Sequence, residues 1–190
     1  MRLGIYGGSF DPPHLGHLIP VLDVAEKLEL DRVRFVPASI QPLKVGRSSA
    51  SAADRLAMTE RLVQGIPGFS VDPAEIGRPG LSFTVDTLAG MAVELPDAER
   101  FLLLGADAFA LFDQWREPDR VRSLATLVVM VRGDEASPVP TAMPGVQLLQ
   151  SRRVDISSTE LRARVRDGRT IRGFVPDAVA DYIAEHRLYR

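Results

Sequence analysis

Short runs of consecutive apolar residues alternate along the chain with longer segments of helical periodicity. The apolar runs predict strands over 2–7, 33–37, 100–105, 125–132 and 146–150, with a short extended piece at 69–72. A strand that is apolar at nearly every position is typical of a sheet buried on both faces.

The segments between these runs carry the signals of helices. They predict helices over 16–29, 52–64, 83–95, 107–112, 118–123, 157–167 and 176–186. In the first of them, Leu18, Leu22, Ala25 and Leu28 fall on one face. The segments 38–51 and 133–145 read as irregular loops.

Strands separated by helices indicate an α/β protein with a doubly wound parallel sheet. We expect one domain over 1–190, in which 155–190 forms a small helical C-terminal portion. Ligands of such folds lie at the carboxyl ends of the strands, near the point where the strand order reverses.

Composition narrows the possible functions. The chain has 190 residues, 45% hydrophobic and 25% charged, which is typical of a globular protein. Its formal charge of -2 gives no support for binding to nucleic acid or to an anionic membrane. There is no cysteine, and no run approaches the roughly 18 apolar residues of a membrane span. We expect a cytoplasmic protein.

The segment GGSFDPPHLGHL, residues 7–18, stands where the first strand becomes a helix. Its glycines would allow positive φ or close approach of a ligand, and Gly16 would leave room beside the helix. His14 and His17 lie three positions apart and share a face. A helix start also offers free N–H groups to a phosphate.

A structural turn with two ordinary histidines is the simpler interpretation of this segment. A metal site is a third, but two histidines with no third ligand nearby support it weakly. The pattern matches neither the G-x-G-x-x-G motif nor a Walker loop. We favour phosphate binding, because glycines, imidazoles and a helix start coincide.

A second candidate segment is DISSTELRARVRDG, residues 155–168. Ser157 and Glu160 have the spacing of a capping box, and Arg162 and Arg166 share a face. We expect Arg162 in the first helical turn, where an arginine opposes the helix dipole unless an anion binds there. Taken alone, the segment fits a capped surface helix and a phosphate site equally well; taken together with the first motif, phosphate binding is favoured.

Two further segments lie between these. In LLLGADAFALFDQW, Gly105 ends a buried strand, and Asp107 could cap a helix or accept hydrogen bonds from a ribose. Trp115 is the only tryptophan of the sequence; it could stack on a flat ring, although such a residue is more often part of a core. In PGLSFTVDTL, Thr84 stands at another helix start, where simple capping is the alternative. Lys44 could swing over bound phosphates.

Together, GGSFDPPHLGH, GADAF followed by a tryptophan, and DISSTELR resemble the bacterial nicotinate-nucleotide adenylyltransferase family, within the H-x-G-H nucleotidyltransferases. The resemblance extends from Gly4 to Tyr189 and includes SFTVDTL. It implies a Rossmann-like fold and adenylyl transfer from ATP to nicotinate mononucleotide, giving deamido-NAD and pyrophosphate. In one departure, Leu43 precedes Lys44 where the family usually has a histidine.

The resemblance also implies roles for individual residues. His14, His17 and Arg162 would be catalytic, and Ser82, Thr84 and Trp115 would bind the nicotinate nucleotide. A larger set would bind ATP: Gly7, Gly8, Ser9, Phe10, Gly16, Lys44, Gly105, Asp107, Ile156, Ser157, Ser158 and Thr159. Mg²⁺ would arrive on the ATP phosphates without a protein site of its own, and a homo-oligomer is possible.

Other functions remain open at this point. A phosphopantetheine or glycerol-phosphate transferase would share the first motif, and a non-catalytic nucleotide-binding regulator would bind ATP without releasing pyrophosphate. A fragment of a tRNA synthetase is disfavoured, because the chain lacks a basic face for RNA.

Overall fold

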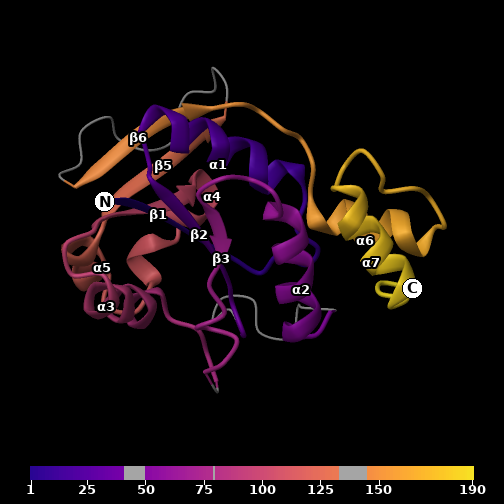
Figure 1. Ribbon diagram of the computed structural model, residues 1–190, viewed down its shortest axis with the longest axis horizontal. Coiled ribbons are helices and arrows are strands. Elements are labelled where there is room, and N and C mark those ends of the chain that lie inside the picture. The colour runs from indigo at the N-terminus through magenta and orange to yellow at the C-terminus, as the bar shows by residue number, and fades with distance from the viewer. Residues whose placement is uncertain (41–49, 79, 133–144) are drawn as a thin grey trace.

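In the computed structural model, the described residues, 1–40, 50–78, 80–132 and 145–190, form a sheet of six parallel strands (Figure 1). The strand order is β3-β2-β1-β4-β5-β6. The strands are β1 (Arg2–Gly8), β2 (Arg32–Pro37), β3 (Phe69–Val71), β4 (Glu99–Gly105), β5 (Thr126–Arg132) and β6 (Val146–Ser151). The order reverses between β1 and β4, so the expected doubly wound topology is confirmed.

Side chains of β4 show why the strands are apolar throughout. Phe101 and Leu103 belong to one buried cluster, and Leu102 and Leu104 belong to another. Successive residues of a strand point to opposite faces, so both faces of the sheet are covered. The first cluster includes residues of α1 and α2, and the second includes residues of α3 and α5.

The helices agree with the sequence pattern to within a few residues. They are α1 (Leu15–Lys27), α2 (Ala52–Val63), α3 (Thr84–Glu94), α4 (Ala106–Phe109), α5 (Pro118–Leu124), α6 (Ser158–Arg166) and α7 (Asp177–Glu185). The helix predicted over 107–112 is wrong in detail: α4 has a single turn, and a separate 3-10 helix, η2 (Phe112–Gln114), follows it. No helix in the described parts is long and apolar enough to cross a membrane.

The C-terminal helices α6 and α7 lie at one end of the molecule, beside α2 (Figure 1). Val179 and Ile183 of α7 join the buried cluster that covers the α1 and α2 face of the sheet. The backbone N–H of Leu15, the first residue of α1, donates a 3.0 Å hydrogen bond to the carbonyl of Phe174. The segment before α7 is therefore attached directly to the start of α1.

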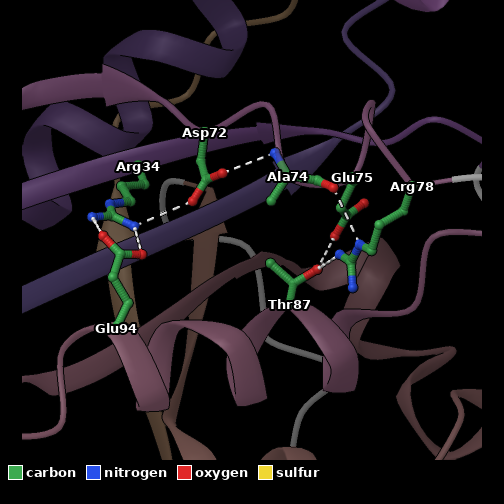
Figure 2. A network of polar contacts seen from close by, with 7 residues as sticks. All are labelled: Arg34, Asp72, Ala74, Glu75, Arg78, Thr87 and Glu94. Carbon is green, nitrogen blue, oxygen red and sulfur yellow. Dashed lines mark hydrogen bonds and ion pairs between the residues drawn. The ribbon is translucent and has the colours of Figure 1, made fainter.

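An ion-pair cluster holds the C-terminal end of α3 against the sheet (Figure 2). Arg34 of β2 lies 3.2 Å from Asp72, just after β3, and 2.6 Å from Glu94, the last residue of α3. The hydrogen bond from Arg34 lowers the pKa of the Glu94 carboxyl and raises the pKa of the guanidinium. The cluster ties the C-terminal end of α3 to β2 and to the residue that follows β3.

Candidate active site

The loop after β1 is shaped by a buried phenylalanine. Phe10 is 1% exposed and adopts a φ of 50°, in the left-handed region. A Cβ on Gly8 would lie 3.0 Å from the Phe10 ring, so a larger residue there would force this buried ring to shift. Of the two possibilities raised for Gly7 and Gly8, positive φ is found at Phe10 instead, and close approach of a ligand stays a prediction.

The two histidines lie together at the start of α1. His14 is the N-cap residue and 4% exposed, whereas His17 is half-buried. Their ring centroids are 3.8 Å apart, and the backbone N–H of His14 donates to Nδ1 of His17 over 3.2 Å. Because Nδ1 of His17 is an acceptor, a neutral His17 ring carries its proton on Nε2.

The start of α6 packs directly on this helix start. The Ser157 hydroxyl accepts a 3.1 Å hydrogen bond from the Glu160 N–H, which confirms the predicted N-cap. A Cβ on Gly16 would lie 3.2 Å from the Ile156 carbonyl oxygen and 2.9 Å from Nδ1 of His14. We expected Gly16 to leave room for a ligand, but on this side protein atoms fill the space.

Two hydrogen bonds join α6 to the loop that leads into α1. The Ser158 hydroxyl donates to the Pro12 carbonyl over 2.8 Å, and the Arg162 guanidinium donates to the Asp11 carbonyl over 2.6 Å. Arg162 lies one turn inside α6 rather than in its first turn and also contacts the Thr159 hydroxyl. The starts of α1 and α6 therefore lie together, although the segments are about 150 positions apart in the sequence.

A buried arginine supports the loop after β1, and no local pattern in the sequence indicates its role. Arg55 of α2 is 2% exposed. Its guanidinium donates to the carbonyls of Ser9 (2.7 Å), Ala38 (2.6 Å) and Ser39 (2.8 Å). Arg55 thus holds the ends of β1 and β2 at a fixed separation. Burial lowers its pKa.

The segment before α3 is tied to the end of β2. The backbone N–H of Ser39 donates a 2.9 Å hydrogen bond to the Ser82 hydroxyl, and the Ser82 N–H donates to the Ile40 carbonyl. Thr84 follows as the first residue of α3 and is half-buried. Ser82 and Thr84 therefore lie beside the carboxyl ends of the strands.

The buried carboxyl group of Glu75 lies next to Ser82 and was not predicted from the sequence. Glu75 is 7% exposed and accepts a 2.6 Å hydrogen bond from Thr87 of α3 (Figure 2). Arg78 donates to the same Thr87 hydroxyl. Burial raises the pKa of Glu75, while hydrogen bonds from Thr87 and Ser82 oppose that rise.

The remaining predicted residues follow β4. Gly105 is the N-cap of α4, which has no side-chain cap, and Asp107 is exposed in its first turn. Trp115 is half-buried against the second core cluster, with its ring centroid 5.3 Å from that of Phe112. Asp107 therefore does not cap the helix, and one face of Trp115 is used in packing.

Lys44 lies outside the described residues. Within the described segments, no three side chains of His, Asp or Glu gather closely enough to hold a metal ion.

A doubly wound sheet with two converging helix starts and a pair of imidazoles at its switch point defines a nucleotidyltransferase of the Rossmann-like class. A model of the cytidylyltransferase-like family matches residues 5–164. The probable nicotinate-nucleotide adenylyltransferase of Gemmatimonas aurantiaca is 48% identical over 197 residues, covering 100% of this chain and 93% of its relative. The corresponding Thermus thermophilus protein is 45% identical over 193 residues, covering both chains fully. The chain belongs to the nicotinate-nucleotide adenylyltransferase family.

Solved structures agree on the fold. The nicotinic acid mononucleotide adenylyltransferase of Plasmodium falciparum, solved with NaAD, has a TM-score of 0.81 at 18% identity. The match covers 99% of this chain and 97% of the other. The same enzyme solved with APC gives a TM-score of 0.78.

Proposed function

We propose that this chain transfers the adenylyl group of ATP to nicotinate mononucleotide, and that the joined starts of α1 and α6 hold the triphosphate. The products are deamido-NAD and pyrophosphate. The observation that carries the proposal is the direct contact between the two motifs, through Gly16, Ser158 and Arg162. The reaction is the one for which the relatives at 48% and 45% identity are named.

The chemistry needs little from the protein beyond positioning. The nucleophile is the phosphate monoester of the mononucleotide, whose second pKa near ~6 leaves it largely ionised at neutral pH. No general base is required. The oxygen of that phosphate forms a bond to the α-phosphorus of ATP as the bond to the bridging oxygen breaks, and pyrophosphate leaves with its electron pair. The enzyme must align two anions and stabilise the charge on the leaving group.

His17 is suited to that second task. The backbone N–H of His14 donates to Nδ1 of His17, so the neutral His17 ring carries its proton on Nε2. This Nε2–H can donate to a phosphate oxygen. We assign His14 and His17 to the phosphates next to the reacting centre. Ser157, Thr159 and Arg162 would bind the β and γ phosphates through hydroxyl, N–H and guanidinium groups.

The residues that would bind the adenosine of ATP and the nicotinate mononucleotide are assigned from their places around the carboxyl ends of the strands. Gly7, Gly8, Ser9 and Phe10 stand at and just after the end of β1 and would bind ATP there, and Gly105 with exposed Asp107 would meet the adenosine. A ribose hydroxyl would donate to the Asp107 carboxylate. Ser82, Thr84 and Trp115 would bind nicotinate mononucleotide, with the exposed part of Trp115 against the pyridine ring.

ATP is expected to enter as its Mg²⁺ complex. The described donors here are imidazoles, hydroxyls, N–H groups and a guanidinium, which suit phosphate oxygens better than a hard cation. Mg²⁺ would neutralise charge on the phosphates, as in other phosphoryl transfers. We also propose that the protein acts in the cytoplasm.

A coupled assay of pyrophosphate release tests the function. The purified chain is given MgATP with nicotinate mononucleotide, nicotinamide mononucleotide or phosphopantetheine, and CTP with glycerol phosphate. We expect the fastest release with nicotinate mononucleotide. Release only with one of the other pairs would reassign the substrate, and ATP binding without release from any pair would indicate a non-catalytic regulator.

A further inference from the structure

The carboxyl group of Asp11 forms hydrogen bonds to two segments that are distant in the sequence, one before α2 and one after α7. Asp11 is 4% exposed and lies in the loop between β1 and α1. Its Oδ1 accepts a 2.7 Å hydrogen bond from the Tyr189 hydroxyl and a 3.2 Å hydrogen bond from the Ala50 N–H. Ala50 precedes α2, and Tyr189 is the penultimate residue of the chain. The last residues are thereby bonded to the loop that carries the histidines.

The backbone of the same residue holds α6. The Asp11 carbonyl accepts from Arg162, so one residue contacts the C-terminal tail through its side chain and α6 through its main chain. His14 lies only three positions further along. A displacement of Asp11 would therefore change the position of the histidine pair relative to Arg162.

We propose that Tyr189 and Asp11 are positioning residues, whose hydrogen bond fixes the loop 8–14 against the C-terminal helices and so sets the geometry of His14, His17 and Arg162. Neither side chain contacts the reacting atoms in this scheme. The proposal rests on the proposed function for its kinetic consequence, but not for its structural one.

The environment of Tyr189 keeps its hydroxyl group protonated and able to donate a hydrogen bond. Its ring packs on the core cluster, and its backbone has a φ of 63°, in the left-handed region. Burial, together with the neighbouring Asp11 carboxylate, raises the pKa of the Tyr189 hydroxyl. The hydroxyl therefore stays protonated at the pH values at which the enzyme is assayed.

A second tyrosine provides a matched control. The Tyr182 hydroxyl of α7 donates a 3.0 Å hydrogen bond to Asp54 of α2, so it also joins the C-terminal part to the rest of the molecule. That bond makes no contact with the loop 8–14. Tyr182→Phe and Tyr189→Phe each remove one hydroxyl that bonds a carboxylate, but only the second should affect the site.

The kinetic test compares kcat and KM for ATP in the two variants. A hydrogen bond to a charged group contributes roughly a tenfold effect or more. We expect Tyr189→Phe to lower kcat/KM for ATP about tenfold, and Tyr182→Phe to change it less than about twofold, with similar falls in Tm. Equal kcat/KM values in wild type and Tyr189→Phe would overturn the proposal, and so would equal losses in both variants.

Hydrogen exchange measured by mass spectrometry separates this proposal from the proposed function. Tyr189→Phe should speed exchange in peptides covering residues 8–18, whereas Tyr182→Phe should speed it in peptides from α2. If the wild type shows no transferase activity, the function is wrong, but this exchange pattern still tests the positioning role. Unchanged exchange over 8–18 in Tyr189→Phe would disprove it.

Discussion

A Cβ atom on Gly16 would lie 3.2 Å from the carbonyl oxygen of Ile156, although the two residues stand 140 positions apart. The same atom would lie 2.9 Å from Nδ1 of His14. The glycine of the H-x-G-H segment therefore lets α1 and the start of α6 approach one another. The proposed phosphate site depends on that approach.

Gly16→Ala should consequently reduce activity by more than the loss of stability in this variant would explain. The new methyl group must displace the His14 ring, which disturbs the histidine pair, or shift the Ile156 carbonyl, which separates the two helix starts. We expect kcat/KM for ATP to fall by about one to two orders of magnitude, as small misplacements of reacting groups do. Steady-state kinetics would measure this.

Gly90→Ala is the control for that substitution. Gly90 lies inside α3, and nothing stands within 4 Å of the position where its Cβ would be. Alanine should stabilise the helix by about 0.4–1 kcal/mol and leave the kinetics unchanged. If Gly16→Ala also kept wild-type kinetics, the close approach of the helices would not matter for catalysis.

His17→Ala tests the leaving-group role. Removing a preorganised donor from a developing charge lowers kcat by roughly two to four orders of magnitude. The KM values for both substrates should change far less, because the interaction strengthens as pyrophosphate departs. Steady-state and single-turnover kinetics would distinguish these effects. Wild-type turnover in the variant would remove His17 from the mechanism.

Glu75 should make stability depend on pH. Burial raises its pKa from the ordinary 4.5, so the folded state binds this proton more tightly than the unfolded state does. The free energy of unfolding contributed by Glu75 therefore falls as pH rises from the ordinary value to the raised one. Glu75→Gln stays neutral and can still accept from Thr87, so its stability relative to wild type should rise across that window. Urea denaturation between pH 4 and pH 8 would measure it.

Glu94→Gln gives a control of opposite sign. The hydrogen bond from Arg34 lowers the pKa of Glu94, so the stability this carboxylate contributes is present above its ordinary pKa and is lost as pH falls. Glu94→Gln should therefore lose stability relative to wild type as pH rises from below the ordinary pKa of 4.5 up to that value, and the urea series must extend below pH 4 to cover this window. Parallel curves for the two variants would contradict the assignment of the buried proton to Glu75.

Local patterns predicted much of this molecule. Apolar runs such as that of β4 indicated strands covered on both faces, and the spacing of Ser157 and Glu160 indicated the start of α6 to within a residue. Asp11 and Arg55 could not be assigned in this way. The partners of Asp11 lie up to 178 positions away, and Arg55 lies in a helix whose spacing reads as amphipathic. Their roles follow from tertiary packing, which no local pattern encodes.

Arg55 leads to the last prediction, because its charge is buried beneath the site. The guanidinium donates three hydrogen bonds to the carbonyls at the ends of β1 and β2. Arg55→Met replaces the apolar part of the arginine side chain with one of similar length but removes the guanidinium, so the three carbonyls lose their donor. Each buried polar group left unsatisfied costs about 1–3 kcal/mol, so we expect unfolding to become easier by about 3–5 kcal/mol.

Arg61→Met on the same helix is the comparison for this loss. The Arg61 guanidinium donates to Ala57 and lies 4.3 Å from the Tyr182 ring centroid, so its removal should cost only about 1 kcal/mol. In Arg55→Met the two strand ends also lose their fixed separation, so KM for both substrates should rise in the folded fraction. Urea denaturation and steady-state kinetics of the two variants would measure these effects. Equal stability of the two variants would show that the three carbonyls are satisfied without Arg55, and the loop after β1 would then need another support.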